Sequence, residues 1–194
     1  MRSMADRVLD ATAGAAARRY GAERVTELAH ALQCAELAEA GGADPELVLA
    51  CLLHDVGRYA VSQDGISDTL ETIPPRPGGG RGHHDAGASL LEPFVPARVA
   101  FLVRAHADAK RYLCAVEPGY YATLSKGSKR TLGLQGGPMS AGEALAAATH
   151  PWWPDALKLR RWDDRAKVAG RPTRPLSAWE PFLRRSLDTR GAGA

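Results

Sequence analysis

The stretch from Leu49 to Arg58 reads Leu-Ala-Cys-Leu-Leu-His-Asp-Val-Gly-Arg and constrains the fold more than any other part of the chain. Its apolar residues predict a buried helix that ends at His54-Asp55, with Gly57 as the helix stop. Burying two polar side chains without partners is costly, and both are good metal ligands. A hydrogen-bonded core histidine beside an aspartate is the commoner arrangement, so the pair alone does not establish a metal site.

Apolar residues recur at helical spacing elsewhere too, and no segment alternates in the manner of a strand. Thr26 can cap one helix, Asp44 followed by Pro45 can open the next, and Ser140 begins a capping box. The chain is therefore predicted to be all-α, a helical bundle. We expect helices over residues 4–20, 26–40, 45–55, 96–106, 110–116, 118–124 and 154–168, a short one before Pro93, one that starts at Ser140, and a last one over 178–187.

Two stretches rich in Gly and Ser are predicted to be loops. Residues 58–82, with a Pro-rich centre, are long enough for a functional lid, although a disordered segment would have the same composition. Residues 125–140 also carry Lys and Arg. The length of 194 residues suits a single domain over 1–194, with a core over about 20–168 and a proline-rich C-terminal tail over 170–194.

Composition limits the classes of function. The formal net charge of +3 is too small to indicate nucleic-acid binding. No apolar run approaches membrane-spanning length and the N-terminus has no apolar signal region, so we expect no membrane partner. Cys34 and Cys51 fall within predicted helices as buried free thiols, with Cys114 as an odd third cysteine, which predicts a reducing, cytoplasmic location. The sequence leaves the oligomeric state open.

Five of the six histidines lie at predicted helix ends or on apolar faces, as do two aspartates. A helix bundle can project such residues toward one centre. Imidazole and carboxylate without thiolate suit iron, manganese or zinc, and six ligands are more than one ion with open positions requires. Two ions bridged by one carboxylate would use the whole set. The candidates are His30, His54, Asp55, His83 or His84, His106 and Asp163.

The order of these residues resembles the HD-domain superfamily of all-α metalloproteins, whose minimal pattern is H…HD…D. Residues 20–168 more specifically resemble the phosphonate-degrading HD-domain oxygenases, which are mixed-valence di-iron enzymes related to myo-inositol oxygenase. The motifs that carry this resemblance are Tyr20-Gly-Ala-Glu23, His30-Ala-Leu-Gln-Cys, Leu53-His-Asp-Val-Gly, His106-x3-Lys110-Arg-Tyr-Leu-Cys, Gln135-Gly-Gly-Pro-Met-Ser and Arg160-Arg-Trp-Asp-Asp-x2-Lys167.

The resemblance implies two iron ions, Fe(II) and Fe(III), with O2 as cosubstrate. Asp163 is preferred over Asp164 because Asp-x3-Lys is the spacing shared with the inositol oxygenase branch. His83 is preferred over His84 because superfamily patterns place the ligand four residues before Gly87. The implied ligands are His30, His54 and Asp163 for one iron, His83 and His106 for the other, and Asp55 as the bridge.

The resemblance also implies how a phosphonate is bound. Tyr20 would occupy an open position on one iron until substrate arrives, and Glu23 would receive a substrate amine; with Asp55 they form the implied catalytic set. The competing Glu27 fits a helix surface better. The substrate-binding residues are Glu23, Lys110, Ser125, Ser128, Gln135 and Arg160, whereas Lys126, Lys129, Arg130 and Arg161 are more simply solvated. Arg58 stands where the family commonly has another histidine, a departure that puts its surroundings in doubt.

The function that the resemblance implies is cleavage of the C–P bond of a 1-hydroxyphosphonate with O2. The expected substrate is 2-amino-1-hydroxyethylphosphonate or an N-methylated analogue, and the products are phosphate and glycine or a related carboxylate. An HD-domain phosphohydrolase of nucleotides or phosphomonoesters, which would activate water with the same ligands, is the alternative. A non-catalytic binding module with a structural metal is a third possibility, disfavoured by the intact ligand set.

Overall fold

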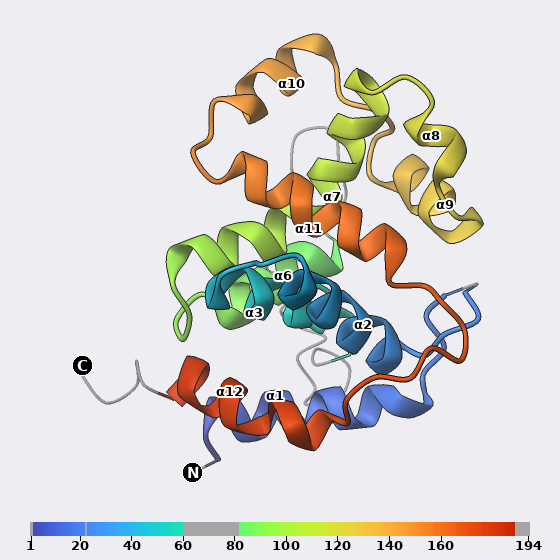
Figure 1. Cartoon of the computed structure of the whole chain (residues 1–194). Coiled ribbons are helices and arrows are strands. Elements are labelled where there is room, and N and C mark those ends of the chain that lie inside the picture. The colour runs from blue at the N-terminus through green and yellow to red at the C-terminus, as the bar shows by residue number, and fades with distance from the viewer. Residues whose placement is uncertain (1, 22, 60–81, 189–194) are drawn as a thin grey trace.

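The computed structural model describes residues 2–21, 23–59 and 82–188, and helices make up most of these ranges (Figure 1). Within them no strand forms, and the only extended pairing is an isolated bridge between Arg19 and Thr26. The prediction of an all-α fold is confirmed. No helix of the described chain is long and apolar enough to cross a membrane.

The helices follow one another with short connections. In chain order they are α1 (Met4–Gly14), the 3-10 turn η1 (Ala15–Ala17), α2 (Glu27–Ala40), α3 (Pro45–Leu53), the 3-10 turn η2 (Val56–Arg58), α6 (His83–Leu91), α7 (Ala97–Val116), α8 (Tyr120–Thr123), α9 (Lys126–Leu134), α10 (Ala141–Ala148), α11 (Trp153–Arg165) and α12 (Leu176–Asp188).

Helix α7 is the long central element, and α3, α6 and α11 pack against it. Helix α2 packs against α3 and α11, which completes the group that carries the candidate ligands. Helices α1 and α12 lie side by side at one edge, while α8, α9 and α10 gather at the opposite end (Figure 1). Leucines from α3, α7 and α12, including Leu52, Leu102 and Leu183, are fully buried in one hydrophobic core. The single-domain organisation stays a prediction.

Several helix starts are fixed by the residues that the sequence predicts. The Thr26 hydroxyl accepts a hydrogen bond from the backbone N–H of Ala29 at 3.1 Å, and Asp44 caps α3 with Pro45 in its first turn. Ser140 forms the predicted capping box with Glu143 at the start of α10. These side chains satisfy N–H groups that have no partner within the helix. The three predicted starts are confirmed.

Other boundaries differ from the predictions. The first helix ends at Gly14 and continues only as a 3-10 turn, α11 ends at Arg165, and α12 extends over Leu176–Asp188 with Pro181 inside it. The predicted loop at 58–82 shares only Arg58 with the 3-10 turn η2, and its residues 60–81 lie outside the described ranges.

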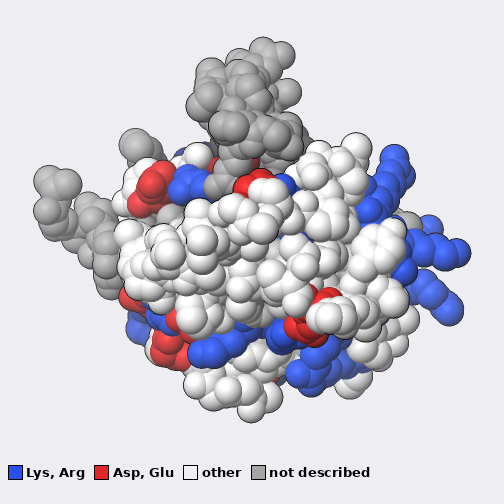
Figure 2. Space-filling view, turned by 90° about the horizontal axis from the view of Figure 1, so that it is seen from above, with Lys and Arg blue, Asp and Glu red and all other residues white. Residues whose placement is uncertain are grey.

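The largest difference is α9, because a loop was predicted over residues 125–140 and a helix occupies 126–134. Ser125 caps it by accepting from the Ser128 N–H at 3.1 Å. Its Gly, Ser and Thr residues lower intrinsic helix propensity, but Ser128 and Leu132 are buried one turn apart on one face. Packing of that face decides the structure. Lys and Arg side chains project from the side of the molecule on which α8 and α9 lie (Figure 2).

Candidate metal centre

Four histidines and one aspartate from separate elements converge inside the bundle. His30 comes from α2, His54 and Asp55 from the end of α3, His83 from the start of α6, and His106 from α7. They form two groups, in each of which the possible ligand atoms lie within 4.8 Å of one another. One group is His30, His54 and Asp55, and the other is Asp55, His83 and His106. Asp55 is therefore shared.

The two carboxylate oxygens of Asp55 face different histidine pairs. Its Oδ2 lies 3.3 Å from His54 Nε2 and 3.6 Å from His30 Nε2. Its Oδ1 lies 2.9 Å from His83 Nε2 and 3.7 Å from His106 Nε2. This is the arrangement that a carboxylate needs to bridge two metal ions.

Backbone carbonyls orient three of the imidazole rings. Because a carbonyl oxygen can only accept, each Nδ1 carries the proton and each Nε2 presents a lone pair to the centre. The Nδ1 donors and their acceptors are His30 with Ala166 O at 2.7 Å, His54 with Cys51 O at 2.8 Å, and His106 with Val103 O at 2.7 Å.

Two further observations indicate that these histidine and aspartate side chains fit a bound metal. The Nε2 atoms of His30 and His54 lie 3.1 Å apart, although the Nδ1 hydrogen bonds leave each Nε2 of the neutral rings without a hydrogen to donate. Both oxygens of Asp55 are buried and accept no hydrogen bond from the described residues. Converging lone pairs and an unsatisfied buried carboxylate are costly unless a cation lies between them.

Asp163 of α11 lies beside the first histidine pair, outside the two closest groups. Its Oδ1 is 3.3 Å from His30 Nε2 and its Oδ2 is 3.9 Å from His54 Nε2. The same carboxylate contacts Arg160 at 2.5 Å and Lys167 at 3.3 Å. It is therefore shared between the histidines and two cations.

The two ambiguous residues of the sequence lie apart from the converging atoms. Asp164 contacts Arg160 and the hydroxyl of Tyr120. His84 Nε2 lies 3.3 Å from Asp85 Oδ2, and His84 belongs to neither ligand group. Position alone thus favours Asp163 over Asp164 and His83 over His84.

The pKa values of the centre depend on burial and on charges at close range. Burial opposes ionisation of Asp55, yet the charges of His54 and His83 hold its pKa well below the usual range. Burial alone would lower the pKa of His54, but Asp55 outweighs it and raises that pKa to about 10. Burial and the His54 charge lower the pKa of His106. Without a metal the Asp55 charge would keep His54 protonated, so a metal would replace that proton and leave the neutral ring described above, whereas His106 is neutral already.

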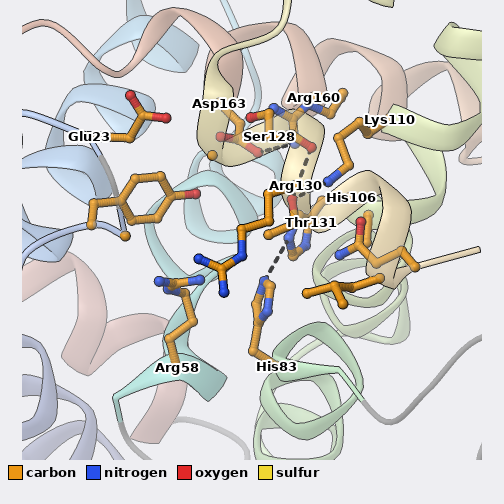
Figure 3. A pocket seen from close by; sticks show the side chains of 16 residues that line it. Glu23, Arg58, His83, His106, Lys110, Ser128, Arg130, Thr131, Arg160 and Asp163 are labelled. Carbon is orange, nitrogen blue, oxygen red and sulfur yellow. Dashed lines mark hydrogen bonds and ion pairs between the residues drawn. The ribbon is translucent and has the colours of Figure 1, made fainter. Parts of the chain in front are cut away.

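A pocket of about 300 Å³ opens beside the centre (Figure 3). One wall is the face of α9, and the opposite wall comes from the segment before α2 and from η2. The predicted site residues that line it are Tyr20, Glu23, His83, His106, Lys110, Ser128, Gln135, Arg160 and Asp163.

Ser125 is absent from the described residues that line the pocket. Its hydroxyl donates to Glu23 Oε1 at 2.5 Å while it caps α9. Gly127 lies against the same carboxylate, because a Cβ added to it would be 2.8 Å from Glu23 Oε1. Ser125 therefore acts on the pocket through Glu23.

Lys110 is a buried cation in this pocket. Its Nζ donates to Thr131 Oγ1 at 2.7 Å, and that hydroxyl donates to the Ser128 carbonyl at 3.1 Å. Burial and the nearby Arg160 guanidinium lower the pKa of Lys110 to about 7. Its charge is therefore poised near neutrality, and a bound anion would favour the protonated amine.

Tyr20 closes one side of the pocket over a candidate ligand. Its ring stacks on His30 with centroids 4.0 Å apart and planes at 24°. The Arg58 guanidinium carbon lies 4.9 Å and Lys167 Nζ 5.8 Å from the Tyr20 ring centroid. The ring is thus held between an imidazole and two cations.

Sequence reasoning missed four residues of this region. Glu27 was assigned to the helix surface, but it is only 4% exposed and its oxygens pair with Arg18 at 2.9 Å and Arg58 at 3.1 Å. Arg58, Arg130 and Thr131 line the pocket. The helical spacing of residues 127, 128, 131 and 134 could have indicated that one face of a helix lines the pocket. It was not used because residues 125–140 were read as a loop. Arg161, by contrast, is half exposed and pairs with Glu117, in line with its solvated interpretation.

Comparison with known proteins gives concordant matches. The HD domain family model matches residues 28–149. A [1-hydroxy-2-(trimethylamino)ethyl]phosphonate dioxygenase (glycine-betaine-forming) of Leisingera caerulea is 37% identical over 169 residues, covering 87% of this chain and 83% of that protein. A hydroxymethylphosphonate dioxygenase of Gimesia maris is 38% identical over 148 residues, covering 76% of this chain and 71% of that protein.

Proposed function

The chain belongs to the HD-domain family and, within it, to the phosphonate oxygenases, and we propose that it uses O2 to cleave the C–P bond of a 1-hydroxyphosphonate in the pocket beside its metal centre. It is an O2-dependent enzyme that binds metal and acts on a small molecule. The observation that carries the proposal is one buried carboxylate between two histidine pairs, next to a pocket with Lys110 and Arg160 in its lining.

We propose that the metals are two irons in the Fe(II)/Fe(III) state. His30, His54 and Asp163 would hold one, His83 and His106 the other, and Asp55 would bridge them. Such a pair, when bound, supplies a site that binds O2 and accepts electrons from the substrate. Imidazole and carboxylate ligands without thiolate support this assignment.

Lys110, Arg160, Ser128 and Gln135 are proposed to hold the phosphonate. Arg160 is 3% exposed and Lys110 is equally buried, so a phosphonate oxygen between them is shielded from water and its charge-assisted hydrogen bonds are strong. Lys110, with its pKa lowered to about 7, would gain its proton as the dianion arrives. Binding and protonation are thereby coupled.

Tyr20 and Glu23 are proposed to control entry. The Tyr20 ring covers His30, so substrate must displace it to reach the adjacent metal position. Glu23 accepts a hydrogen bond from Ser125, which holds its carboxylate in the lining of the pocket. The ring would exclude water and keep O2 from an empty site.

The chemistry explains why O2 is required. A C–P bond has no leaving group of the kind that makes phosphate-ester hydrolysis feasible, so the carbon must be oxidised first. The C–H and C–P bonds of that carbon break, and a carboxylate, inorganic phosphate and a proton are released. O2 supplies the oxygen that the products gain and accepts the electrons from both bonds, so no separate reductant is needed.

The test is to load the purified protein with iron and mix it with hydroxymethylphosphonate or 2-amino-1-hydroxyethylphosphonate under O2. We expect oxygen uptake matched by phosphate release, and a mixed-valence EPR signal that is lost in His54→Ala. Phosphate release from p-nitrophenyl phosphate without O2, with no turnover of either phosphonate, would instead establish the phosphohydrolase alternative.

A further inference from the structure

The pocket carries more positive charge than a single phosphonate requires. Its described lining includes the cations Arg58, Lys110, Arg130 and Arg160 but only two carboxylates, and one of these is the candidate ligand Asp163. Lys110 and Arg160 lie at the inner end beside the metal centre and account for the phosphonate under the proposed function. The other two cations need a separate explanation.

The positive charge of Arg58 is only partly neutralised by its ion pair. Its Nε donates to Glu27 Oε1 at 3.1 Å, but Glu27 Oε2 accepts from Arg18 Nε at 2.9 Å. One carboxylate is therefore shared by two guanidinium groups. The Arg58 side chain is 24% exposed and its guanidinium lies over the Tyr20 ring, so its outer N–H groups remain close to the pocket.

Arg130 has no ion pair or hydrogen bond among residues 2–21, 23–59 and 82–188. It stands on the face of α9 that forms the pocket wall, one turn beyond Gly127. In Figure 3 the guanidinium ends of Arg58 and Arg130 both point into the pocket, Arg58 from η2 and Arg130 from α9. Two guanidinium groups in one pocket repel each other, and an anion bound between them would offset that repulsion.

We propose that Arg58 and Arg130 form a second anion-binding point at the outer end of the pocket, and that the preferred 1-hydroxyphosphonate bears a carboxylate on its side arm. This rests on the proposed function and specifies the substrate class of that same site. The reaction at the carbon attached to phosphorus is unchanged, so a carboxylate-bearing arm yields a dicarboxylate and phosphate with the same balance of atoms and electrons.

The chemistry of guanidinium favours this assignment over an ammonium arm. Two guanidinium groups present planar pairs of N–H donors that match a carboxylate, whereas a trimethylammonium group has no N–H and repels both. Apart from the candidate ligand Asp163, Glu23 is the one carboxylate in the described lining, and its single negative charge offsets only one of the two guanidinium groups. The outer pocket is left with a net positive charge.

The test compares four 1-hydroxyphosphonates that differ only in the arm: none, a primary amine, a trimethylammonium group and a carboxylate. Oxygen uptake and phosphate release give kcat/KM for each with the iron-loaded enzyme. We expect kcat/KM for the compound with the carboxylate arm to exceed that for the trimethylammonium compound by roughly a hundred-fold. The carboxylate can form two charge-assisted contacts that the trimethylammonium group cannot form.

Variants show whether the two arginines cause the preference. Arg130→Gln should lower the ratio of kcat/KM for the carboxylate arm to that for no arm by about ten-fold, and Arg130→Glu should shift the preference toward the amine arm. Arg58→Gln should act in the same direction. Arg161→Gln is the matched control, since it removes one exposed guanidinium that pairs with Glu117 away from the pocket.

The outcomes separate the two proposals. If the compound without an arm is turned over but the trimethylammonium or amine arm is preferred to the carboxylate, only the second anion-binding point is wrong. The second anion-binding point would also be wrong if Arg130→Gln left the preference among the arms unchanged. Arg130 is exposed, so that variant should fold. If none of the four compounds consumes O2 and releases phosphate, the proposed function fails and this inference fails with it.

Discussion

The metal centre and the pocket wall beside it are built by different means. In the centre, His54 and His106 take their orientation from carbonyls of residues Cys51 and Val103, three positions earlier in the chain. In the wall, Arg58 and Glu23 are oriented by side chains from distant parts of the chain. Local geometry therefore orients these two ligands, although His30 is held by the distant Ala166 carbonyl, whereas tertiary contacts orient these two groups of the wall.

Because of this difference, we expect the two regions to respond differently to substitution. Each ligand is a necessary part of a shared coordination set, so its loss should remove metal and with it almost all activity. The wall is a set of adjustable side chains, so changes there should alter affinity or selectivity and leave the metal content intact. Four substitutions test this contrast, in order of decreasing expected effect.

Asp55→Asn should have the largest effect, because one residue serves both ligand groups. An amide cannot bridge two cations as a carboxylate does, and a metal pair contributes several kcal/mol to transition-state stabilisation, so activity should fall by roughly a thousand-fold or more. Iron content and O2 uptake measure the result. Asp108→Asn, on α7 outside both ligand groups, is the matched control, and equal losses in the two variants would contradict a special role for Asp55.

His83→Ala compared with His84→Ala tests the second ligand group. His83 Nε2 lies 2.9 Å from Asp55, whereas His84 belongs to neither group. We expect His83→Ala to lose one iron and the mixed-valence EPR signal, with activity lowered by about a hundred-fold or more. His84→Ala should keep both irons. The reverse pattern would assign the ligand to His84.

Lys110 provides a pH test of the wall. Its pKa is lowered to about 7 by burial and Arg160, so the free enzyme loses this charge as the pH rises above that value. The protonated amine binds the phosphonate, and therefore KM should rise by up to about ten-fold per pH unit above neutrality. Lys110→Arg keeps its charge over this range and should flatten the profile. Iron content should be the same at each pH, and a slope that persists in Lys110→Arg would exclude Lys110 as its cause.

How far the sequence predicts each region follows from the same contrast. His54 and His106 stand at inward positions of their helices, so helical spacing predicts that both face the interior of a bundle. Asp55 follows directly, because the helix end places it beside His54. The resemblance of the motifs adds the family, which the comparisons bear out. The all-α fold is predictable for the same reason, since several helices combine an apolar face with a capping residue at their start.

The pocket wall was not predicted from the sequence because its structure depends on tertiary contacts. Helix α9 has weak propensity and was read as a loop, so Arg130 was interpreted as a solvated side chain. Glu27 follows the Thr26 cap, where a carboxylate is usually exposed, and only the positions of Arg18 and Arg58 explain its burial. Charges that meet across the fold leave no local signal in the sequence.

Gly127→Ala should have the smallest effect, and it separates helix stability from pocket geometry. Alanine raises helix propensity by up to about 1 kcal/mol, but the added Cβ would lie 2.8 Å from Glu23 Oε1 and must displace that carboxylate. We expect a gain in thermal stability of a few degrees at most, together with a roughly three-fold change in KM and unaltered iron content. Gly133→Ala is the matched control on the same helix, because nothing lies within 4 Å of its added Cβ. It should raise Tm and leave KM unchanged. If Gly127→Ala behaved like Gly133→Ala in both measurements, Glu23 would not be positioned by α9, and the wall would be more tolerant than its contacts imply.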